Sequence, residues 1–225
     1  MTLTMTQDIC HHPSDDILMG YAAGALPEAF NLMAATHLSL CDNCRAQAGA
    51  FDAVGGELLD QISRTSPVSM SPDSLQTTLA HIAAGTEAAS RDAAAPTGRG
   101  ILPGPLRAYV GGDLEVVRWW PVGMGVRQAR LKTSRAASAR LLFIPAGTAM
   151  PEHGHRGTEM TMVLQGAFLD DGVRFGRGDV ETADSDCQHT PIADIGEDCV
   201  CLAVTDAPLR FDGIVHRIAQ KFLRI

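Results

Sequence analysis

Two groups of metal-binding side chains stand out in this sequence, and they differ in chemical character. His37, Cys41 and Cys44 form an H-x3-C-x2-C pattern, in which two of the three ligands are sulfur. His153, His155 and Glu159 combine imidazole with carboxylate and contain no sulfur. Thiolate-rich sets typically hold a structural Zn²⁺, whereas imidazole and carboxylate sets are also typical of sites with an open coordination position. We therefore expect two metal centres with different roles.

The first group can converge on one ion in either of two local structures. On a continuous helix, residues 37, 41 and 44 lie on one face because their spacings are four and three. Alternatively, Asp42 and Asn43 interrupt the helix and the two cysteines form a knuckle. A tetrahedral zinc site needs a fourth ligand, and His11 and His12 are both candidates.

This pattern, with a histidine upstream, resembles the zinc-binding anti-sigma domain. The resemblance implies that zinc is held by His12, in preference to His11, together with His37, Cys41 and Cys44. It also implies four helices, the last separated by a hinge, that clamp an extracytoplasmic-function sigma factor and hide its promoter-binding surfaces. The zinc is then expected to stabilise a small fold rather than to take part in a reaction.

The second group belongs to a longer pattern, G-x5-H-x-H-x3-E-x6-G, that matches the first cupin motif. Its members are Gly147, His153, His155, Glu159 and Gly166. A weaker second cupin motif supplies His189, with Asp184, Asp186 and Ala193 in place of the usual Pro, Gly and Asn. This resemblance implies a β-barrel whose metal ligands are His153, His155, Glu159 and His189. Three imidazoles and a carboxylate suit Zn²⁺, Mn²⁺, Fe²⁺ or Ni²⁺, and the sequence does not choose among them.

An anti-sigma domain followed by a cupin-like domain resembles the ChrR-type anti-sigma factors over essentially the whole chain. The resemblance implies a regulator, not an enzyme, that inhibits an extracytoplasmic-function sigma factor in a one-to-one complex. It implies release of the sigma factor by singlet oxygen, and in some cases by organic hydroperoxides. The N-terminal domain is expected to suffice for inhibition, and the cupin domain to be required for the response.

Three cysteines near the second site are candidate redox sensors. Cys187 lies two residues before His189, and Cys199 and Cys201 alternate on an expected strand, so their thiols share one face. Exposed, partly ionised thiols are oxidised readily, whereas buried thiols are inert. Both interpretations stay open, and His189, Met160 and Met162 are alternative targets.

The sequence patterns around these groups predict an α + β fold with two domains. Residues 1–85 are expected to form a four-helix zinc-binding domain, with Pro27 in the first turn of the second helix and a break at 66–72. Residues 86–105 are rich in Ala, Gly and Pro, and are expected to form a flexible linker. Residues 106–225 alternate short β-type runs with turn signals at 111–113 and 170–172, which favours a cupin-type barrel.

Charge and hydropathy exclude some partners. The net charge is −8, and residues 1–85 hold nine acidic side chains against two basic ones. Phosphate contacts need cations, so direct nucleic-acid binding is not expected, whereas a basic protein partner suits this charge. The chain has no apolar run long enough to cross a bilayer and no signal peptide at its start, so we expect a cytoplasmic protein without a membrane partner.

Two other functions remain compatible with the sequence. A cupin with three histidines, a glutamate and an open position can be a dioxygenase or isomerase, with the helical domain as a regulatory appendage. Alternatively, the chain is a cytosolic metal- or metabolite-binding module without a sigma factor. Co-purification with a small basic sigma factor distinguishes the anti-sigma factor from both.

Overall fold

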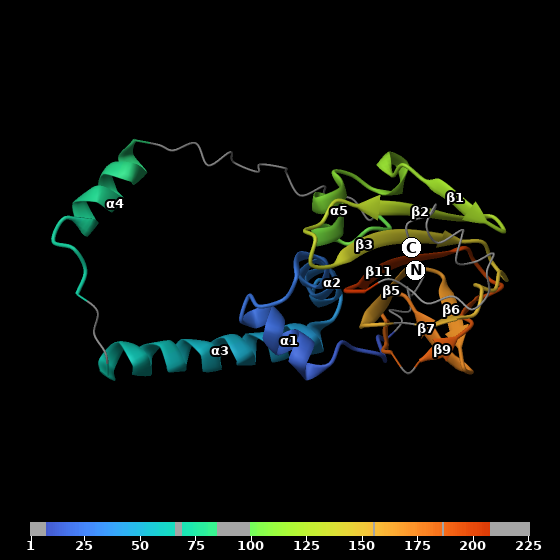
Figure 1. Cartoon of the computed structure of the whole chain (residues 1–225), viewed down its shortest axis with the longest axis horizontal. Helices are drawn as coiled ribbons and strands as arrows, with labels where there is room; N and C mark the ends of the chain where they lie inside the picture. Colours follow the sequence, from blue (N-terminus) through green and yellow to red (C-terminus); the bar gives the residue numbers. More distant parts are fainter. Residues whose placement is uncertain (1–7, 66–68, 85–99, 155, 186, 208–225) are drawn as a thin grey trace, which may run out of the picture.

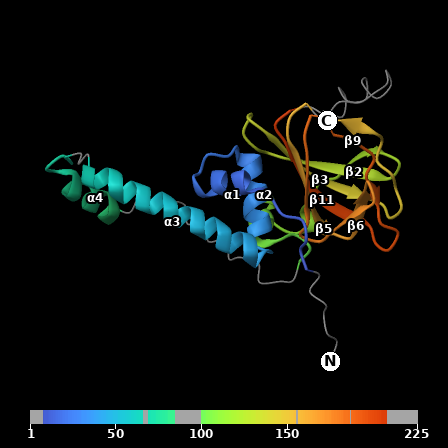
Figure 2. The ribbon, with the colours of Figure 1, turned by 90° about the horizontal axis from the view of Figure 1, so that it is seen from below.

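A helical module lies beside a β-barrel in the computed structural model, which describes residues 8–65, 69–84, 100–154, 156–185 and 187–207 (Figure 1). The helical module comprises α1 (Asp15–Ala22), α2 (Glu28–Leu38), α3 (Asp42–Thr65) and α4 (Ser74–Ala83). The helices α1 and α2 pack with the first turns of α3, whereas α4 stands apart from the barrel (Figure 2). No helix among the described residues is both long and apolar enough to span a lipid bilayer.

The first three helices follow the predicted pattern, with small shifts at their ends. Asp15 and Asp16 lie in the first turn of α1, where acidic side chains interact favourably with the helix dipole. Pro27 is the residue before α2 rather than part of its first turn. The helices α2 and α3 are separate, so the continuous helix is wrong; the interruption falls at Ser39 and Leu40, not at Asp42 and Asn43.

The barrel contains one large sheet and two small ones. The six-stranded sheet has the order β1-β2-β3-β11-β5-β8, and the smaller sheets have the orders β10-β6-β7 and β4-β9. The strands are β1 (Trp120–Gly123), β2 (Val126–Leu131), β3 (Ser138–Ile144), β4 (His153–Gly154), β5 (Glu159–Gln165), β6 (Ala167–Asp170), β7 (Val173–Gly176), β8 (Val180–Ala183), β9 (Gln188–His189), β10 (Ile192–Ala193) and β11 (Cys199–Thr205). Every pairing between them is antiparallel.

One of the two predicted hairpin turns is confirmed and the other is wrong. Asp171 and Gly172 join β6 to β7, and both have positive φ, as a tight hairpin turn requires. Gly111 instead ends an additional short helix, α5 (Gly104–Val110), with a φ of 86°. A 3-10 helix, η1 (Leu114–Val116), follows it.

The helical module and the barrel share one hydrophobic core. The apolar face of α2 packs against the outer face of the large sheet, where Phe30 and Met33 belong to the same buried cluster as Leu202. Leu102 and Leu106 complete this cluster, so residues 100–105 of the predicted linker pack on the barrel. The rest of the predicted linker, residues 86–99, lies outside the described residues. The two modules are therefore joined by packing as well as by the chain.

The strand β11 lies at the centre of this arrangement and is buried on both faces. Val200, Leu202 and Val204 face α2, whereas Cys199 and Cys201 face the barrel interior with a second apolar cluster. A strand covered on both sides is expected to be apolar at every position, and this strand is nearly so.

Two candidate metal centres and the contact between them

Four side chains of the helical module form a cluster suited to zinc. The ligand atoms of His12, His37, Cys41 and Cys44 all lie within 4.8 Å of one another. The Nδ1 atom of His12 is 3.5 Å from the Sγ of Cys41 and 3.4 Å from that of Cys44. Tetrahedral zinc with bonds of about 2.3 Å to sulfur and about 2.0 Å to nitrogen separates such atoms by about 3.5 Å. The spacing between the donor atoms therefore fits a zinc ion.

His37 is presented to this cluster as a neutral ligand. Its side chain is fully buried, and burial lowers its pKa to about 4. Its Nδ1–H donates to the carbonyl oxygen of Gly178 over 3.0 Å, which leaves the Nε2 lone pair as the available donor. That Nε2 atom is buried and has no hydrogen-bond partner among the described residues. An orphaned nitrogen beside two thiols, oriented through its other nitrogen, fits metal ligation.

The thiol of Cys44 needs a cation in order to ionise. Burial, and then the neighbouring Cys41, raise the pKa of Cys44 to about 12. Cys41 precedes α3, and its Sγ accepts the backbone N–H of Cys44 over 3.4 Å. A bound dication stabilises thiolates directly, so a zinc ion would offset the burial that keeps Cys44 protonated.

The structure places His12, and not His11, in the cluster. The ring of His11 packs instead against Phe175 of β7, with 4.5 Å between the ring centroids. The backbone of His11 is bonded to the barrel, because its carbonyl oxygen accepts the N–H of Val180 over 3.0 Å. This backbone pairing points the next side chain, that of His12, towards the cysteines.

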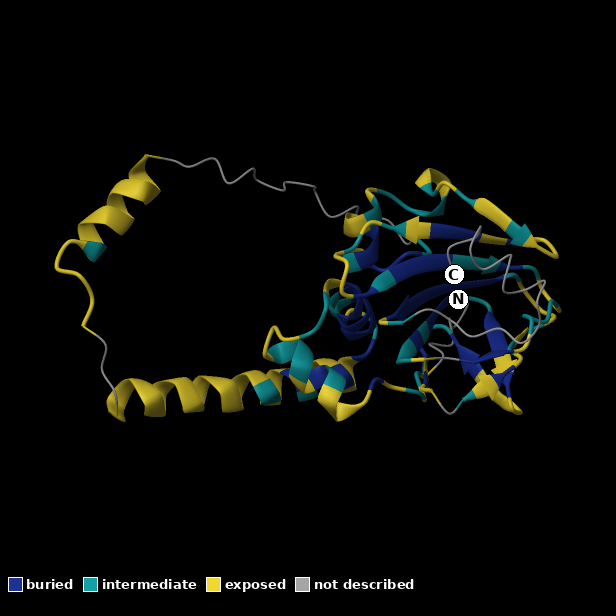
Figure 3. Ribbon diagram, in the orientation of Figure 1, coloured by how far each residue is buried: buried dark blue, intermediate teal, exposed yellow. Residues whose placement is uncertain are grey.

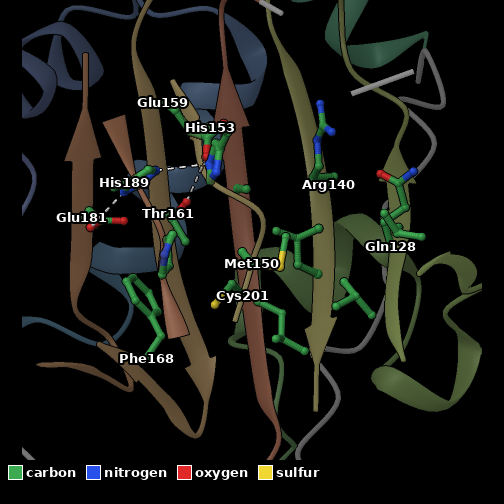
Figure 4. Close-up of a pocket in the computed structure, with 16 residues that line it drawn as sticks. Gln128, Arg140, Met150, His153, Glu159, Thr161, Phe168, Glu181, His189 and Cys201 are labelled. Carbon is green, nitrogen blue, oxygen red and sulfur yellow. Dashed lines mark hydrogen bonds and ion pairs between the residues drawn. The ribbon is translucent and has the colours of Figure 1, made fainter. Parts of the chain in front are cut away.

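Three of the four predicted ligands of the second set, His153, Glu159 and His189, line one cavity inside the barrel. His153 on β4 pairs with His189 on β9, and their Nε2 atoms are 3.2 Å apart. Glu159, the first residue of β5, lines the same cavity (Figure 4). Two imidazole nitrogens this close need a shared proton or a cation between them. His155 lies outside the described residues.

Two carboxylates that sequence analysis did not single out surround His189. Asp170 accepts from its Nδ1 over 2.8 Å, and Glu181 is 3.8 Å from the same atom. Although burial opposes it, hydrogen bonding to Glu181 and Asp170 raises the pKa of His189 to about 9. Asp170, Glu181 and His189 also form a possible metal-binding group of their own. In the sequence, Asp170 is part of the turn signal at 170–172, and this turn accounts for an aspartate there without a ligand role.

The cavity beside these ligands is small and mostly apolar, with a volume of about 80 Å³. Its apolar lining includes Leu142, Ile144, Met150, Phe168 and Cys201. Burial raises the pKa of Glu159 to about 7, despite the opposing effects of Arg140 and His189. A cation at the histidines would favour the ionised carboxylate. The donor set and its surroundings fit a divalent metal.

Two of the candidate redox cysteines, Cys187 and Cys201, lie in environments that disfavour thiolate formation. The Sγ atoms of Cys199 and Cys201 are 3.4 Å apart on one face of β11, and both residues are buried. Hydrogen bonding with Cys199 and burial raise the pKa of Cys201, and burial followed by nearby carboxylates raises that of Cys187. Met160 and Met162 are fully buried in the core shared with α2, so Met150 is the methionine that reaches the cavity.

A turn of the barrel contacts the candidate zinc centre through two different segments. Asp179 accepts the N–H groups of Cys10 and His11 through Oδ1 over 2.7 and 2.9 Å, and that of Gly176 through Oδ2 over 2.7 Å. The neighbouring Gly178 holds His37. The turn between β7 and β8 therefore contacts both the segment that carries His12 and the helix that carries His37.

Comparison with known proteins agrees with this two-part structure. Residues 108–208 match the family described as the ChrR cupin-like domain. The chain is 54% identical over 217 residues to the anti-sigma-E factor ChrR of Cereibacter sphaeroides, covering 96% of this chain and 99% of that protein. This chain belongs to the ChrR family of anti-sigma factors. The predicted family and the fold of helices followed by a cupin-like domain are thus confirmed.

A solved structure of the same family extends the similarity to three dimensions. The crystal structure of Rhodobacter sphaeroides SigE in complex with the anti-sigma ChrR matches with a TM-score of 0.76 and 53% identity, covering 88% of this chain and 100% of that chain. ChrR proteins are regulators of transcription, so these relationships assign this chain a regulatory role and do not favour a metalloenzyme.

Proposed function

We propose that this chain binds an extracytoplasmic-function sigma factor in a one-to-one complex, holds it inactive and releases it under oxidative stress. Membership of the ChrR family and the solved complex of its relative support the partner. The proposed complex places the chain in the cytoplasm, where sigma factors act, without direct contact to nucleic acid or membrane.

The observation that carries this proposal is the exposed apolar surface of α3 and α4. Leu58 and Ile62 of α3 are 55% and 63% exposed, and Leu75 and Ile82 of α4 are 62% and 71% exposed. Figure 3 shows the outer part of α3 and nearly all of α4 as exposed. Apolar faces of this kind mark protein-interaction sites. We call this set of four residues the clamp face.

The charge of the clamp helices complements a basic partner. On α3, Asp52, Glu57 and Asp60 accompany the clamp face, and the only basic side chains of that helix are Arg45 and Arg64. An acidic helix steers a basic protein onto its surface and helps to exclude acidic ones. A small sigma factor that itself binds DNA has the required charge.

The direct test is reconstitution with the extracytoplasmic-function sigma factor encoded in the same organism. We expect a one-to-one complex by light scattering and loss of transcription from a promoter that depends on that sigma factor. Transcription by the primary sigma factor, in the same extract, is the control and should be unchanged. A chain that leaves the extracytoplasmic sigma factor fully active would refute the proposal.

The proposed zinc site holds the helical module together. His12, His37, Cys41 and Cys44 would bind Zn²⁺, and zinc binding supplies on the order of 10 kcal/mol of folding free energy in zinc-finger peptides. We assign inhibition to this module, residues 1–85, because it carries the clamp face. We assign sensing to residues 106–225, with 86–105 connecting the two.

The proposed sensing site is the cupin cavity. His153, His155, Glu159 and His189 would hold Zn²⁺ or another divalent metal, with Asp170 orienting His189. An oxidant that enters this cavity meets the metal ligands and the sulfur atoms of Met150 and Cys201. The proposed redox role extends to Cys199, which contacts Cys201, and to Cys187. The raised pKa values of Cys201 and Cys187 disfavour oxidants that react only with the thiolate.

The turn at Gly178 and Asp179 offers a route from sensing to release. Glu181 of β8 lines the cavity and contacts His189, and it lies only three residues from the carbonyl oxygen that holds His37. A change in the cavity that shifts β8 would loosen both the His37 hydrogen bond and the segment bearing His12. In this proposal a displaced barrel that is still packed on α2 distorts the zinc site and so opens the clamp, whereas a helical module without a barrel is not distorted and keeps its partner.

A further inference from the structure

Two arginines face each other at one end of the barrel interior. Arg130 of β2 is directly opposite Arg140 of β3 in the sheet register. Gln128 and Leu142, two residues away on the same strands, line the cupin cavity, so both arginines lie on the cavity face. Like charges placed directly opposite each other on a sheet are destabilising. This pair therefore needs a role beyond stability.

Arg140 is buried without a direct ionic partner in the part of the chain that the structure describes. Arg140 is only 7% exposed, and no described residue forms a hydrogen bond or close ion pair with its guanidinium. Glu159 attracts it and Arg130 repels it, and burial lowers its pKa. Figure 4 shows its guanidinium at the same end of the cavity as Glu159 and His153. Glu159 compensates this charge only in part, because Arg130 opposes it, and an anionic ligand on the guanidinium would offset that repulsion.

A wide depression leads from the surface to this arginine. It has a volume of about 720 Å³, and Arg140 lines both this depression and the cavity behind it. Arg130, Lys132 and Arg135 also line it, against one carboxylate, that of Asp206. Asp206 already accepts the backbone N–H of Thr158 over 2.9 Å. The depression is therefore a cationic funnel that narrows to a buried guanidinium.

We propose that the funnel and the cavity together bind a small organic carboxylate, with the carboxylate on Arg140 and a short apolar body among the cavity residues. A planar guanidinium pairs with a carboxylate through two parallel hydrogen bonds. The mostly apolar cavity offers an alkyl group contact that inorganic phosphate cannot use. This binding goes beyond sigma-factor inhibition and does not depend on it.

Calorimetry of the full-length, zinc-loaded protein with hexanoate tests the proposal. We expect saturable binding of one hexanoate, with hexan-1-ol and inorganic phosphate at least about tenfold weaker, because each lacks one of the two contacts. Hexanoate that does not bind, or phosphate that binds as tightly, would overturn the assignment.

Variants locate the site. Arg140→Gln should weaken hexanoate binding at least about tenfold, and Arg140→Lys should restore part of it by keeping the charge without the planar fork. Arg118→Gln, which removes an exposed arginine outside the funnel, is the matched control and should bind normally. Circular dichroism verifies folding, and Arg130→Gln, at an exposed position, should also weaken binding if Arg140 variants do not fold. Binding that is unaffected by the folded variants contradicts the proposed site, whatever the sigma-factor assay shows.

Discussion

At the scale of single residues, the two nitrogens of His37 explain how one side chain serves two modules. Its Nδ1–H is bonded to Gly178 of the barrel, and its Nε2 is directed to the cysteines of the helical module. A hydrogen bond of this kind fixes the tautomer and the ring orientation of a metal ligand. The geometry of the same cluster predicts which of the adjacent histidines, His11 or His12, binds zinc.

His12→Ala should lose one zinc ion per chain, whereas His11→Ala should retain it. The reason is that His12 Nδ1 lies within 3.5 Å of both thiols, while the ring of His11 packs on Phe175. Metal analysis of the two purified variants, after dialysis, makes the comparison. Equal zinc contents would show that His12 is not a ligand.

At the scale of elements, the outer part of α3 and all of α4 leave apolar side chains exposed in the part of the chain that the structure describes. Leu58 and Ile62 recur at a spacing of four, so they form one stripe on the outer part of α3. Such stripes generally bury themselves against another protein. Their exposure here is thus a functional rather than a folding feature.

Leu58→Glu should weaken sigma-factor binding by at least about tenfold, since central apolar contacts at interfaces contribute roughly 2 kcal/mol or more. The thermal midpoint should change little, because Leu58 is exposed in the free chain. Ser63→Glu adds the same charge to the opposite side of α3 and is the control. Surface plasmon resonance measures both; equal affinities would exclude this stripe from the interface.

The turn between β7 and β8 is the element that links the barrel to the candidate zinc site. Asp179 uses one carboxylate oxygen for Cys10 and His11 and the other for Gly176. An asparagine has one acceptor oxygen and cannot satisfy both sides.

Asp179→Asn should therefore release zinc from the helical module several-fold faster to a chromogenic chelator. The exposed Glu197→Gln, which removes the same charge elsewhere, should behave as the parent chain. Identical release rates for the two variants would mean that the barrel does not support the zinc site.

At the scale of the whole molecule, the shared hydrophobic core means that separating the two modules costs free energy. The face of α2 that includes Phe30, Leu32 and Met33 is buried against the barrel cluster. Removing the barrel exposes side chains whose burial is worth roughly 1.5–3 kcal/mol each.

A chain truncated after about residue 90 should still bind the sigma factor, because the clamp face and zinc ligands remain. It should lose the oxidant response and melt at a lower temperature than the full chain. Transcription assays with and without a singlet-oxygen source, together with calorimetric melting, check these three outcomes. A truncated chain that is folded yet cannot inhibit would contradict the proposed division of labour.

The sequence by itself determined the ligand types and the local elements that carry them. The motifs that contain His37, Cys41 and Cys44, and His153 and Glu159, predicted two metal sites because the types and spacing of ligands within a short segment can be read from the chain. Sequence periodicity also predicted the central residues of the elements α3, β5 and β11.

Only the tertiary structure decided how these parts meet. The family resemblance had already favoured His12 over His11, but the Gly178 contact of His37 joins residues far apart in the chain, as does the bond between Asp170 and His189. Local patterns carry no information about such pairs, since packing sets them. Gly178 illustrates the difference: its motif position is readable, but its φ of 92° and its close approach to Ile9 are consequences of docking.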